Sequence, residues 1–317
     1  MTGEPAFCVC VPVRNEERRL PVLLAALAAQ DVPGRISVAL CINNSTDGSL
    51  PQAQAAADRW KDRLDIVVDL KTFPEHRAHA GAARRAAMSV GLEHLGDRSN
   101  GVLISTDADT RPPPNWLSAN LAAIADGADL VGGRLVLDEA EPISADVAAL
   151  RRLWDAYWRE VRMIEDEIDP SPHDPAPRHG DHTGASLAIT AAAYLSAGGV
   201  PEQPTGEDRA LVIAAQAQEA RLVHPLAVWT RVSARTTGRA AGGMAEDMTR
   251  LFDQARKGGP IMAPDFSHWR QRASWRRGQR HDAASARRLP ALETQLPAMP
   301  LDLDLRGWAD GLERPAA

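Results

Sequence analysis

The sequence contains few cysteines, and their spacing gives no sign of a scaffold that depends on them. Only Cys8, Cys10 and Cys41 occur in 317 residues, so the number is odd and no C-x-x-C pair is present. This pattern indicates neither a disulfide framework nor a structural zinc site. We interpret the three residues as buried, inert thiols, which are typical of proteins in a reducing cytosol.

Long apolar segments and a basic leader are also missing. Residues 1–13 have neither a basic stretch nor a long apolar one, so we expect no signal peptide. No run approaches the ~18 apolar residues of a membrane-spanning helix. We therefore expect a cytoplasmic protein without a transmembrane segment, and leave open peripheral contact with the inner face of the membrane. The formal net charge of −6 argues against nucleic acid as a partner.

The composition of the chain and the spacing of its apolar residues indicate an α/β fold. Hydrophobic residues make up 44% and charged residues 25% of the chain, which is an ordinary globular composition. Short apolar runs alternate with segments of helical spacing, and this alternation predicts βαβ units around a mostly parallel central sheet. The expected strands are 6–13, 35–42, 65–70 and 101–106, and the expected helices between and around them are 16–30, 49–64 and 78–95.

The second half is less regular. A long amphipathic helix is predicted at 145–168, with its apolar residues on one stripe, and a loop rich in proline and histidine follows it. The chain from residue 265 is first basic and then rich in proline, and we expect it to be only partly ordered. The remaining expected elements are strands at 128–137 and 221–230 and helices at 115–127, 190–198, 206–219 and 241–257.

Polar residues follow the expected strands of the first half. They are the turn 12–16, the stretch 43–49, and the carboxylates Asp107 and Asp109. Because ligands bind outside the carboxyl ends of the strands in an open α/β sheet, these residues mark the expected crevice. Two close carboxylates suit a Mg²⁺ or Mn²⁺ ion that also binds the phosphates of a substrate. The alternative is that Asp109 or Thr110 caps a helix beginning near the three prolines.

Five segments in this order resemble family 2 glycosyltransferases: VCVPVRNEERRLPVLLAALAAQ, INNSTDGS, GAARRAA, LISTDADTRPPPNWL and GASLAITAAAYLSAGGVPEQPTGEDRAL. The resemblance covers roughly residues 6–230 and implies a GT-A fold. It divides the chain into a glycosyltransferase domain, 1–240, and a C-terminal helix with a basic tail, 241–317. Within the domain, 1–136 is the nucleotide-sugar-binding half, and 137–240 is the acceptor-side half that carries the inserted helix.

The resemblance assigns donor-binding roles at several positions. Pro12, Arg14 and Glu16 correspond to the loop that lies along the base and ribose of the donor nucleotide. Asn43 stands where the family usually has an aspartate that reads uracil, and an amide can still read a base. Arg84 corresponds to the basic residue that faces the donor phosphates.

The resemblance also implies a divalent cation, Mn²⁺ or Mg²⁺, held by Asp107 and Asp109, with Asp107 at the donor. The family's histidine ligand is missing, because Thr230 stands at its position. His182 and His224 are alternatives, and the third ligand is left open. Arg239, in a basic loop with Arg231 and Arg235, is expected to close over the diphosphate; a solvated loop is the alternative.

On the acceptor side, Asp208 is the candidate catalytic base, Glu207 orients its neighbours, and Gly184 lets the backbone approach the sugar. The alternative for the acidic pair is a helix start favoured by the macrodipole, with Thr205 as its cap. The inserted helix either walls the acceptor site or packs on the core. The tail, with Trp269 and Trp275, either touches an anionic membrane or is solvated or in contact with another subunit.

The sequence therefore predicts a metal-dependent glycosyltransferase that moves a sugar from a UDP- or GDP-sugar to a hydroxyl acceptor, with inversion. Saccharide, lipid-linked and small-molecule acceptors all stay open. One alternative is a sugar-phosphate nucleotidyltransferase, although the first strand lacks the glycine-rich loop that such enzymes use. The other is a non-catalytic nucleotide- or sugar-binding protein on the same scaffold.

Overall fold

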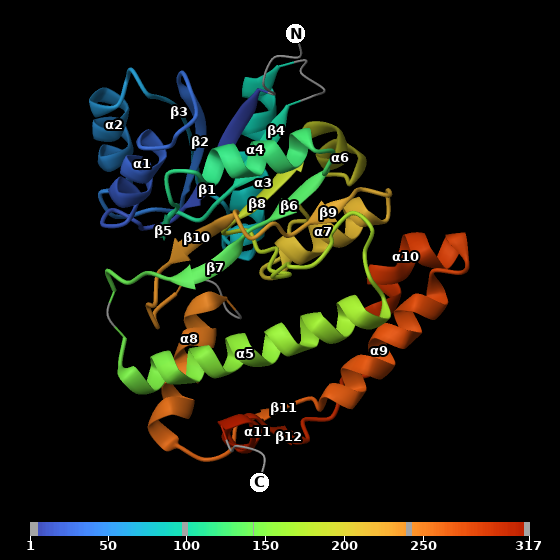
Figure 1. Cartoon of the computed structure of the whole chain (residues 1–317). Helices are drawn as coiled ribbons and strands as arrows, with labels where there is room; N and C mark the ends of the chain where they lie inside the picture. The colour runs from blue at the N-terminus through green and yellow to red at the C-terminus, as the bar shows by residue number, and fades with distance from the viewer. Residues whose placement is uncertain (1–5, 97–100, 142, 239–242, 314–317) are drawn as a thin grey trace.

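A computed structural model describes residues 6–96, 101–141, 143–238 and 243–313. Its centre is a seven-stranded sheet in the order β3-β2-β1-β4-β8-β6-β9 (Figure 1). The first four strands are parallel, and β8 runs antiparallel to both β4 and β6. The strands are β1 Phe7–Val13, β2 Ile36–Asn43, β3 Leu64–Lys71, β4 Val102–Ser105, β6 Leu130–Gly132, β8 Leu187–Thr190 and β9 Leu222–Val223. The expected α/β class with a mostly parallel sheet is confirmed.

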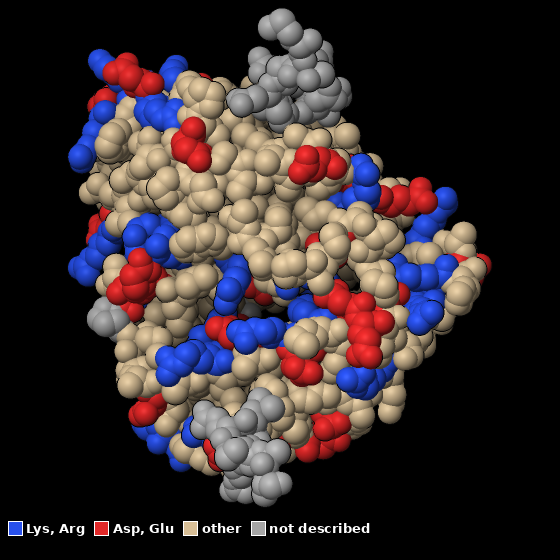
Figure 2. All heavy atoms as spheres, viewed as in Figure 1, with Lys and Arg blue, Asp and Glu red and all other residues tan. Residues whose placement is uncertain are grey.

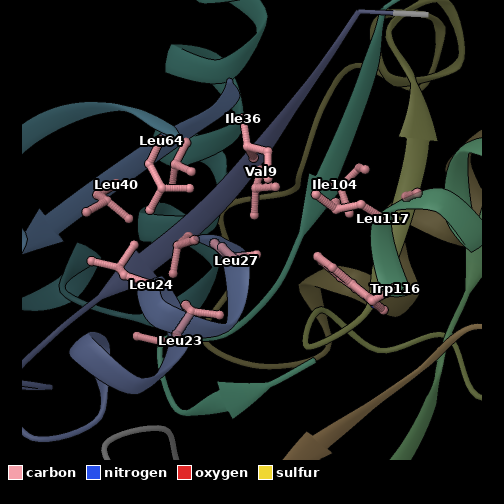
Figure 3. Close-up of a cluster of buried hydrophobic side chains, with 14 of the residues drawn as sticks. Val9, Leu23, Leu24, Leu27, Ile36, Leu40, Leu64, Ile104, Trp116 and Leu117 are labelled. Carbon is pink, nitrogen blue, oxygen red and sulfur yellow. The ribbon is translucent and has the colours of Figure 1, made fainter. Parts of the chain in front are cut away.

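Helices cover both faces of this sheet, which explains why its strands read as continuous apolar runs. On one face, Val9 and Val11 pack against Leu23 and Leu27 of α1 and Trp116 of α4 (Figure 3). On the other face, the thiols of Cys8 and Cys10 pack among residues of α3, α6 and α7, so the expectation of buried cysteines is confirmed. The helices are α1 Leu20–Ala28, α2 Ser49–Arg59, α3 Ala80–Leu95, α4 Trp116–Ala125, α6 Ala191–Ser196 and α7 Glu207–Gln216, with a 3₁₀ turn at Glu75–Arg77.

The strand order places a crevice at the carboxyl ends of β1 and β4, two neighbouring inner strands of the sheet. The chain runs outward from β1 through β2 to β3, and then returns to β4 on the other side of β1. The loops that leave β1 and β4 therefore diverge at their carboxyl ends, which is where a ligand site forms in an open α/β sheet. The turn after β1 and the aspartates after β4 lie at this point.

A second sheet extends beside the first. It contains β5 Thr110–Arg111, β10 Trp229–Val232 and β7 Arg134–Leu137, in that order. The single strands expected at 128–137 and 221–230 are therefore wrong, because each segment divides into two strands that belong to different sheets. In the first segment the division falls at Gly132 and Gly133. A Cβ atom at Gly133 would collide with the Ser186 side chain, so that side chain fits here only because residue 133 is a glycine.

The inserted helix forms at the expected residues, as α5 Ala145–Ile168, and lies away from the central sheet (Figure 1). Its apolar stripe packs mainly on the C-terminal part of the chain, where Tyr157 is fully buried. The Tyr157 hydroxyl donates to the carbonyl of Pro264 at 2.8 Å and accepts from Trp269 Nε1 at 2.6 Å. Of the two alternatives for this stripe, packing in a core is the one observed.

The segment after residue 265, which we expected to be only partly ordered, forms helices. Its basic residues pair with acids elsewhere in the chain: Arg276 binds Glu165 and Arg280 binds Asp169, each at 2.8 Å. The helices of this segment are α9 Phe266–Gln279, α10 Ala283–Glu293 and α11 Leu305–Glu313, with the short strand β12 Leu303–Asp304. Before it lie α8 Met244–Lys257 and the short strand β11 Met262–Ala263. Among the described residues, we find no helix with the length and apolar character needed to cross a membrane.

Candidate active site

A cavity of about 480 Å³ opens at the carboxyl ends of β1, β2 and β4. All but one of the residues that the sequence singled out for a site line it. They are Pro12, Arg14, Glu16, Asn43, Arg84, Asp107, Asp109, Gly184, Glu207 and Asp208. The remaining residue, Arg239, lies outside the described residues. The structure thus brings together groups that are up to two hundred positions apart in the chain.

Arg84 connects the two acidic sites of this cavity. Its guanidinium is buried and binds Asp107 Oδ1 at 2.8 Å and Glu207 Oε1 at 2.9 Å. It also donates to the hydroxyl of Ser105 and to the carbonyl of Gly184. Burial acts to lower the pKa of Arg84, but the surrounding carboxylates outweigh it and raise that pKa. Arg84 therefore holds Asp107, which follows β4, and Glu207, at the acidic start of α7, in one arrangement.

Gly184 makes this arrangement possible. A Cβ atom at this position would collide with the Arg84 guanidinium. The space beside Gly184 that we expected an approaching sugar to use is therefore filled by Arg84, and the requirement for glycine comes from this internal contact.

A second arginine engages Asp109. Arg235 Nη2 lies 2.7 Å from Asp109 Oδ2 and 2.8 Å from Glu16 Oε1. Burial raises the pKa of Asp109 to about 6, against the opposing effect of Arg235. The helix-cap alternative for Asp109 is wrong, because α4 begins at Trp116 with Asn115 as its N-cap. The negative charge of each aspartate is thus offset by one arginine: Arg84 pairs with Asp107, and Arg235 pairs with Asp109.

The donor set around Asp107 and Asp109 suits a hard divalent cation, since Mg²⁺ is usually bound by one or two carboxylates together with substrate phosphates. Among residues 6–96, 101–141, 143–238 and 243–313, no group of three or more His, Cys, Asp or Glu side chains could hold a metal by itself. The two aspartates therefore fit a cation that takes its other ligands from a substrate. Asp109 would also have to exchange Arg235 for the metal.

The two histidines considered as a third ligand lie elsewhere. His224 Nδ1 lies 2.7 Å from Asp174 Oδ2, and His224 Nε2 lies 3.2 Å from His182 Nδ1. Burial and the neighbouring His224 lower the pKa of His182 to about 4. Thr230 is buried in β10. The sequence does not predict the hydrogen-bonded chain Asp174–His224–His182, because nothing in the polar loop 169–182 indicates that Asp174 turns inward.

Asp208 lies in the first turn of α7, and backbone amides orient its carboxylate. Its Oδ2 accepts from the Gly184 N–H and its Oδ1 accepts from the Arg209 N–H, each at 2.7 Å. Gly206, in the left-handed region with φ +72°, is the N-cap residue, so Thr205 is not the cap. Glu207 is buried against Arg84. The carboxylate of Asp208 is thus held at the cavity wall, where it can accept a proton.

The loops after β1 and β2 bind each other. The Glu16 N–H donates to Ser49 Oγ at 2.8 Å, and Asp47 accepts from the N–H groups of Glu17 and Ser49 at 3.0 Å. Asp47 is therefore a turn residue that joins the two loops, and the N-cap of α2 is Gly48. Arg14 donates to the carbonyl of Ala78, which fixes the loop against the chain before α3.

Comparisons with known proteins find a family match, curated relatives and solved structures of similar fold. Residues 8–161 match the family model described as Glycosyl transferase family 2. Undecaprenyl-phosphate 4-deoxy-4-formamido-L-arabinose transferases of Pseudomonas fluorescens and Pseudomonas aeruginosa are 31% and 32% identical over 127 residues, which is 39% of this chain. That region is 34% of those proteins, so the chain spans about a third of the length of the curated relatives it matches.

Two solved structures share the fold. The mannosyltransferase PcManGT from Pyrobaculum calidifontis, in complex with GDP-Man and Mn²⁺, has a TM-score of 0.52 at 19% identity, over 98% of this chain and 80% of that one. S. aureus TarS 1-349, in complex with UDP, has a TM-score of 0.50 at 15% identity, over 87% of this chain and 71% of that one. At these identities the likeness shows a shared fold.

Proposed function

Because this chain belongs to glycosyl transferase family 2 through residues 8–161 and has the GT-A fold, we propose that it transfers a sugar from a nucleoside-diphosphate sugar to an acceptor hydroxyl. One observation carries the proposal. Asp107 and Asp109 face the same cavity as Asp208, and Arg84 links the two sets of acids. The cavity thus combines a place for a charged leaving group with a candidate base.

The donor half of the cavity suits a nucleotide. The turn 12–16 and Asn43 lie at the carboxyl ends of β1 and β2, and Asn43 is 2% exposed. An amide both donates and accepts hydrogen bonds, so Asn43 can read a base edge. The neighbours solved with GDP-Man and UDP support a GDP- or UDP-sugar as the donor class.

Asp107 and Asp109 would hold a Mn²⁺ or Mg²⁺ ion together with donor phosphate oxygens. Such an ion supplies charge neutralisation of the departing nucleoside diphosphate. Arg235, once released from Asp109, is placed to pair with the same phosphates, because an arginine guanidinium binds phosphate oxygens as readily as carboxylates.

Asp208 performs the proton transfer in this proposal. Its carboxylate takes the proton from the acceptor hydroxyl while the oxygen of that hydroxyl bonds to the anomeric carbon. The bond from the anomeric carbon to the diphosphate breaks, and the nucleoside diphosphate leaves with its electron pair. Attack from the side opposite to the leaving group inverts the anomeric configuration. The Gly184 and Arg209 amides keep the carboxylate oriented for this step.

The acceptor is the least constrained part of the proposal. The curated relatives are named for transfer involving undecaprenyl phosphate, which keeps a lipid-linked acceptor among the candidates beside saccharides and small molecules. With a lipid-linked acceptor, the protein would work at the inner face of the membrane.

Thermal-shift titration tests the donor half. Purified protein is heated with UDP, GDP and their sugars, with and without Mn²⁺, because a ligand that binds only the folded state raises the melting temperature. We expect a metal-dependent shift for one nucleotide, lost in Asp109→Asn and kept in the control Asp126→Asn, which lies on the exposed end of α4. The absence of a shift with every nucleotide would refute the donor assignment.

Product analysis tests the base. With a donor identified, Asp208→Asn should keep nucleotide binding and lose at least a hundredfold in turnover, since positioned general bases contribute about 10²–10⁴. Full activity in that variant would remove Asp208 from the mechanism.

A further inference from the structure

Several hydrogen-bond donors of the candidate active site are already engaged within the protein. Arg84 binds Asp107 and Glu207, and Arg14 donates to the carbonyl of Ala78. Figure 2 shows a similar pairing on one face of the molecule, where basic and acidic side chains lie close together beside the hollow between the sheet body and α5. A ligand gains most from a donor that no protein group occupies, because breaking an existing hydrogen bond offsets the new one.

His79 supplies a donor of this kind from the start of α3. It lines the cavity and is the N-cap residue of the helix. Its Nδ1 accepts a hydrogen bond from the backbone N–H of Ala82 at 3.2 Å. A ring nitrogen that accepts a hydrogen bond carries a lone pair, so the proton of the neutral ring is on the other nitrogen. The cap therefore fixes the tautomer of His79 and leaves an Nε2–H group as its hydrogen-bond donor.

The Nε2–H group of His79 is accessible to a ligand. The residue is half-buried, and in the part of the chain that the structure describes we find no hydrogen-bond partner for its Nε2. Three side-chain atoms of that part are sealed from solvent without a partner, namely Asn120 Oδ1, His179 Nε2 and Thr183 Oγ1. Because His79 Nε2 is not one of them, it is open to the cavity or to solvent.

The segment that leads to His79 is anchored to the loops after β1 and β2. Asn44, which follows Asn43, donates from Nδ2 to the carbonyl of Phe73 at 2.8 Å and accepts from the N–H of Phe73 at 3.1 Å. Arg14 donates to the carbonyl of the residue before His79 at 2.7 Å. A group that is held in place before a ligand arrives loses little conformational entropy on binding. His79 is therefore oriented in advance, beside the two loops that the proposed function assigns to the nucleotide.

We propose that His79 is a nucleotide-binding residue, whose Nε2–H group donates a hydrogen bond to an oxygen of the nucleotide in the candidate active site. This inference rests on the proposed transferase function and adds to it a binding residue that neither the motifs nor the family resemblance assigned. The accepting oxygen belongs to the ribose or to another part of the nucleotide, because hydroxyl, carbonyl and phosphate oxygens all accept from an N–H group. The same side chain thus caps α3 with one ring nitrogen and binds the ligand with the other.

Two substitutions separate nucleotide binding from the capping role. His79→Ser keeps an N-cap, because a serine hydroxyl accepts from the same backbone amides, and it removes the Nε2–H group. His79→Ala removes both. We expect each variant to bind the nucleotide about fivefold more weakly, the loss of one hydrogen bond, whereas only His79→Ala should have a clearly lower melting temperature. His94→Ser is the matched control, since His94 lies in the last turn of α3 and outside the cavity.

Calorimetric titration of the full chain measures these affinities without any transfer reaction. The probes are UDP and GDP, each with its 2′-deoxy analogue, in the presence of Mn²⁺. A loss in His79→Ser for the ribonucleotide alone assigns the contact to the 2′-hydroxyl, and an equal loss for both forms assigns it to another oxygen of the nucleotide.

The titration of His79→Ser decides the proposal. If this variant binds the nucleotide as tightly as the wild type, His79 only caps the helix and the proposal is overturned. The wild-type titration keeps the two proposals separate. Failure of the wild type to bind any nucleotide refutes the transferase function and the role of His79 together, whereas normal binding by His79→Ser refutes the role of His79 alone.

Discussion

Replacing Arg84 by methionine tests the link between the two acidic sites. The change keeps a long apolar stem and removes the guanidinium, which donates to Glu207, Asp107, Ser105 and the carbonyl of Gly184. The two carboxylates that lose a partner differ in exposure. The Asp107 side chain is 37% exposed and can be hydrated, whereas that of Glu207 is 6% exposed.

Most of the cost should therefore come from Glu207. Removing one partner of a buried ion pair costs about 3–5 kcal/mol, because the remaining charge has no solvent to compensate it. Typical domains are stable by about 5–15 kcal/mol, so the variant should lose a large part of its stability. Urea unfolding followed by circular dichroism measures the change in the free energy of unfolding.

Two further variants make the measurement decisive. Arg85→Met removes the next arginine of α3, whose guanidinium is 40% exposed and binds backbone carbonyls at 198 and 200, so it should cost about 1 kcal/mol. In the double variant Arg84→Met with Glu207→Gln, the stranded charge is gone, and the total cost should fall below the sum of the single changes. If Arg84→Met costs no more than Arg85→Met, or if the double variant shows no coupling, Arg84 does not stabilise the acidic pair.

Three other expectations follow from the packing and the histidines. Gly133→Ala should destabilise the fold by about 1–3 kcal/mol, because its methyl group has no space beside the Ser186 side chain; an unchanged urea midpoint would contradict this. Tyr157→Phe should cost about 0.5–1.5 kcal/mol, the usual net contribution of a hydrogen bond, since the half-buried Pro264 carbonyl and Trp269 Nε1 lose their partner, and calorimetry should show a lower melting temperature than the wild type. Burial lowers the pKa values of His179 and His182 to about 4, so between pH 6.5 and 4 the unfolded chain binds more protons than the folded one. Stability should then fall by about 2 kcal/mol per pH unit as the pH decreases through that window, because each of the two histidines contributes up to about 1.4 kcal/mol per unit, and a flat urea midpoint from pH 6.5 to 5 would disprove the assignment.

The sequence was sufficient to predict the position of a site residue where that residue directly follows or begins a recognisable strand or helix. Asp107 and Asp109 could be placed at the crevice because an apolar run ends immediately before them, and the parallel sheet then fixed their position. Asp208 was placed beside them by the family resemblance of its motif, and it lies in the first turn of α7. In each case one stretch of about ten residues contains both the element and the polar group.

The partners of these residues could not be predicted, since they depend on contacts that cross the whole chain. Arg235 reaches Glu16 over 219 positions. The ion pairs that order the C-terminal helices are equally remote, so composition alone suggested a solvated tail. Nor does the sequence show that Gly132 and Gly133 separate two sheets, because the need for glycine at 133 arises from Ser186, which lies just before β8.

The ion pairs between the ends of α5 and α9 also affect when this chain can finish folding during its synthesis. Glu165 and Asp169 leave the ribosome 111 residues ahead of Arg276 and Arg280, which are the arginines that they bind at 2.8 Å. At about 5–20 residues per second, that interval is roughly 5–20 seconds of synthesis. During it the sheet body can form, but two acids that end up buried remain without these partners. The buried acids therefore gain these partners only when α9 has been synthesised, and folding of this chain finishes late in its synthesis.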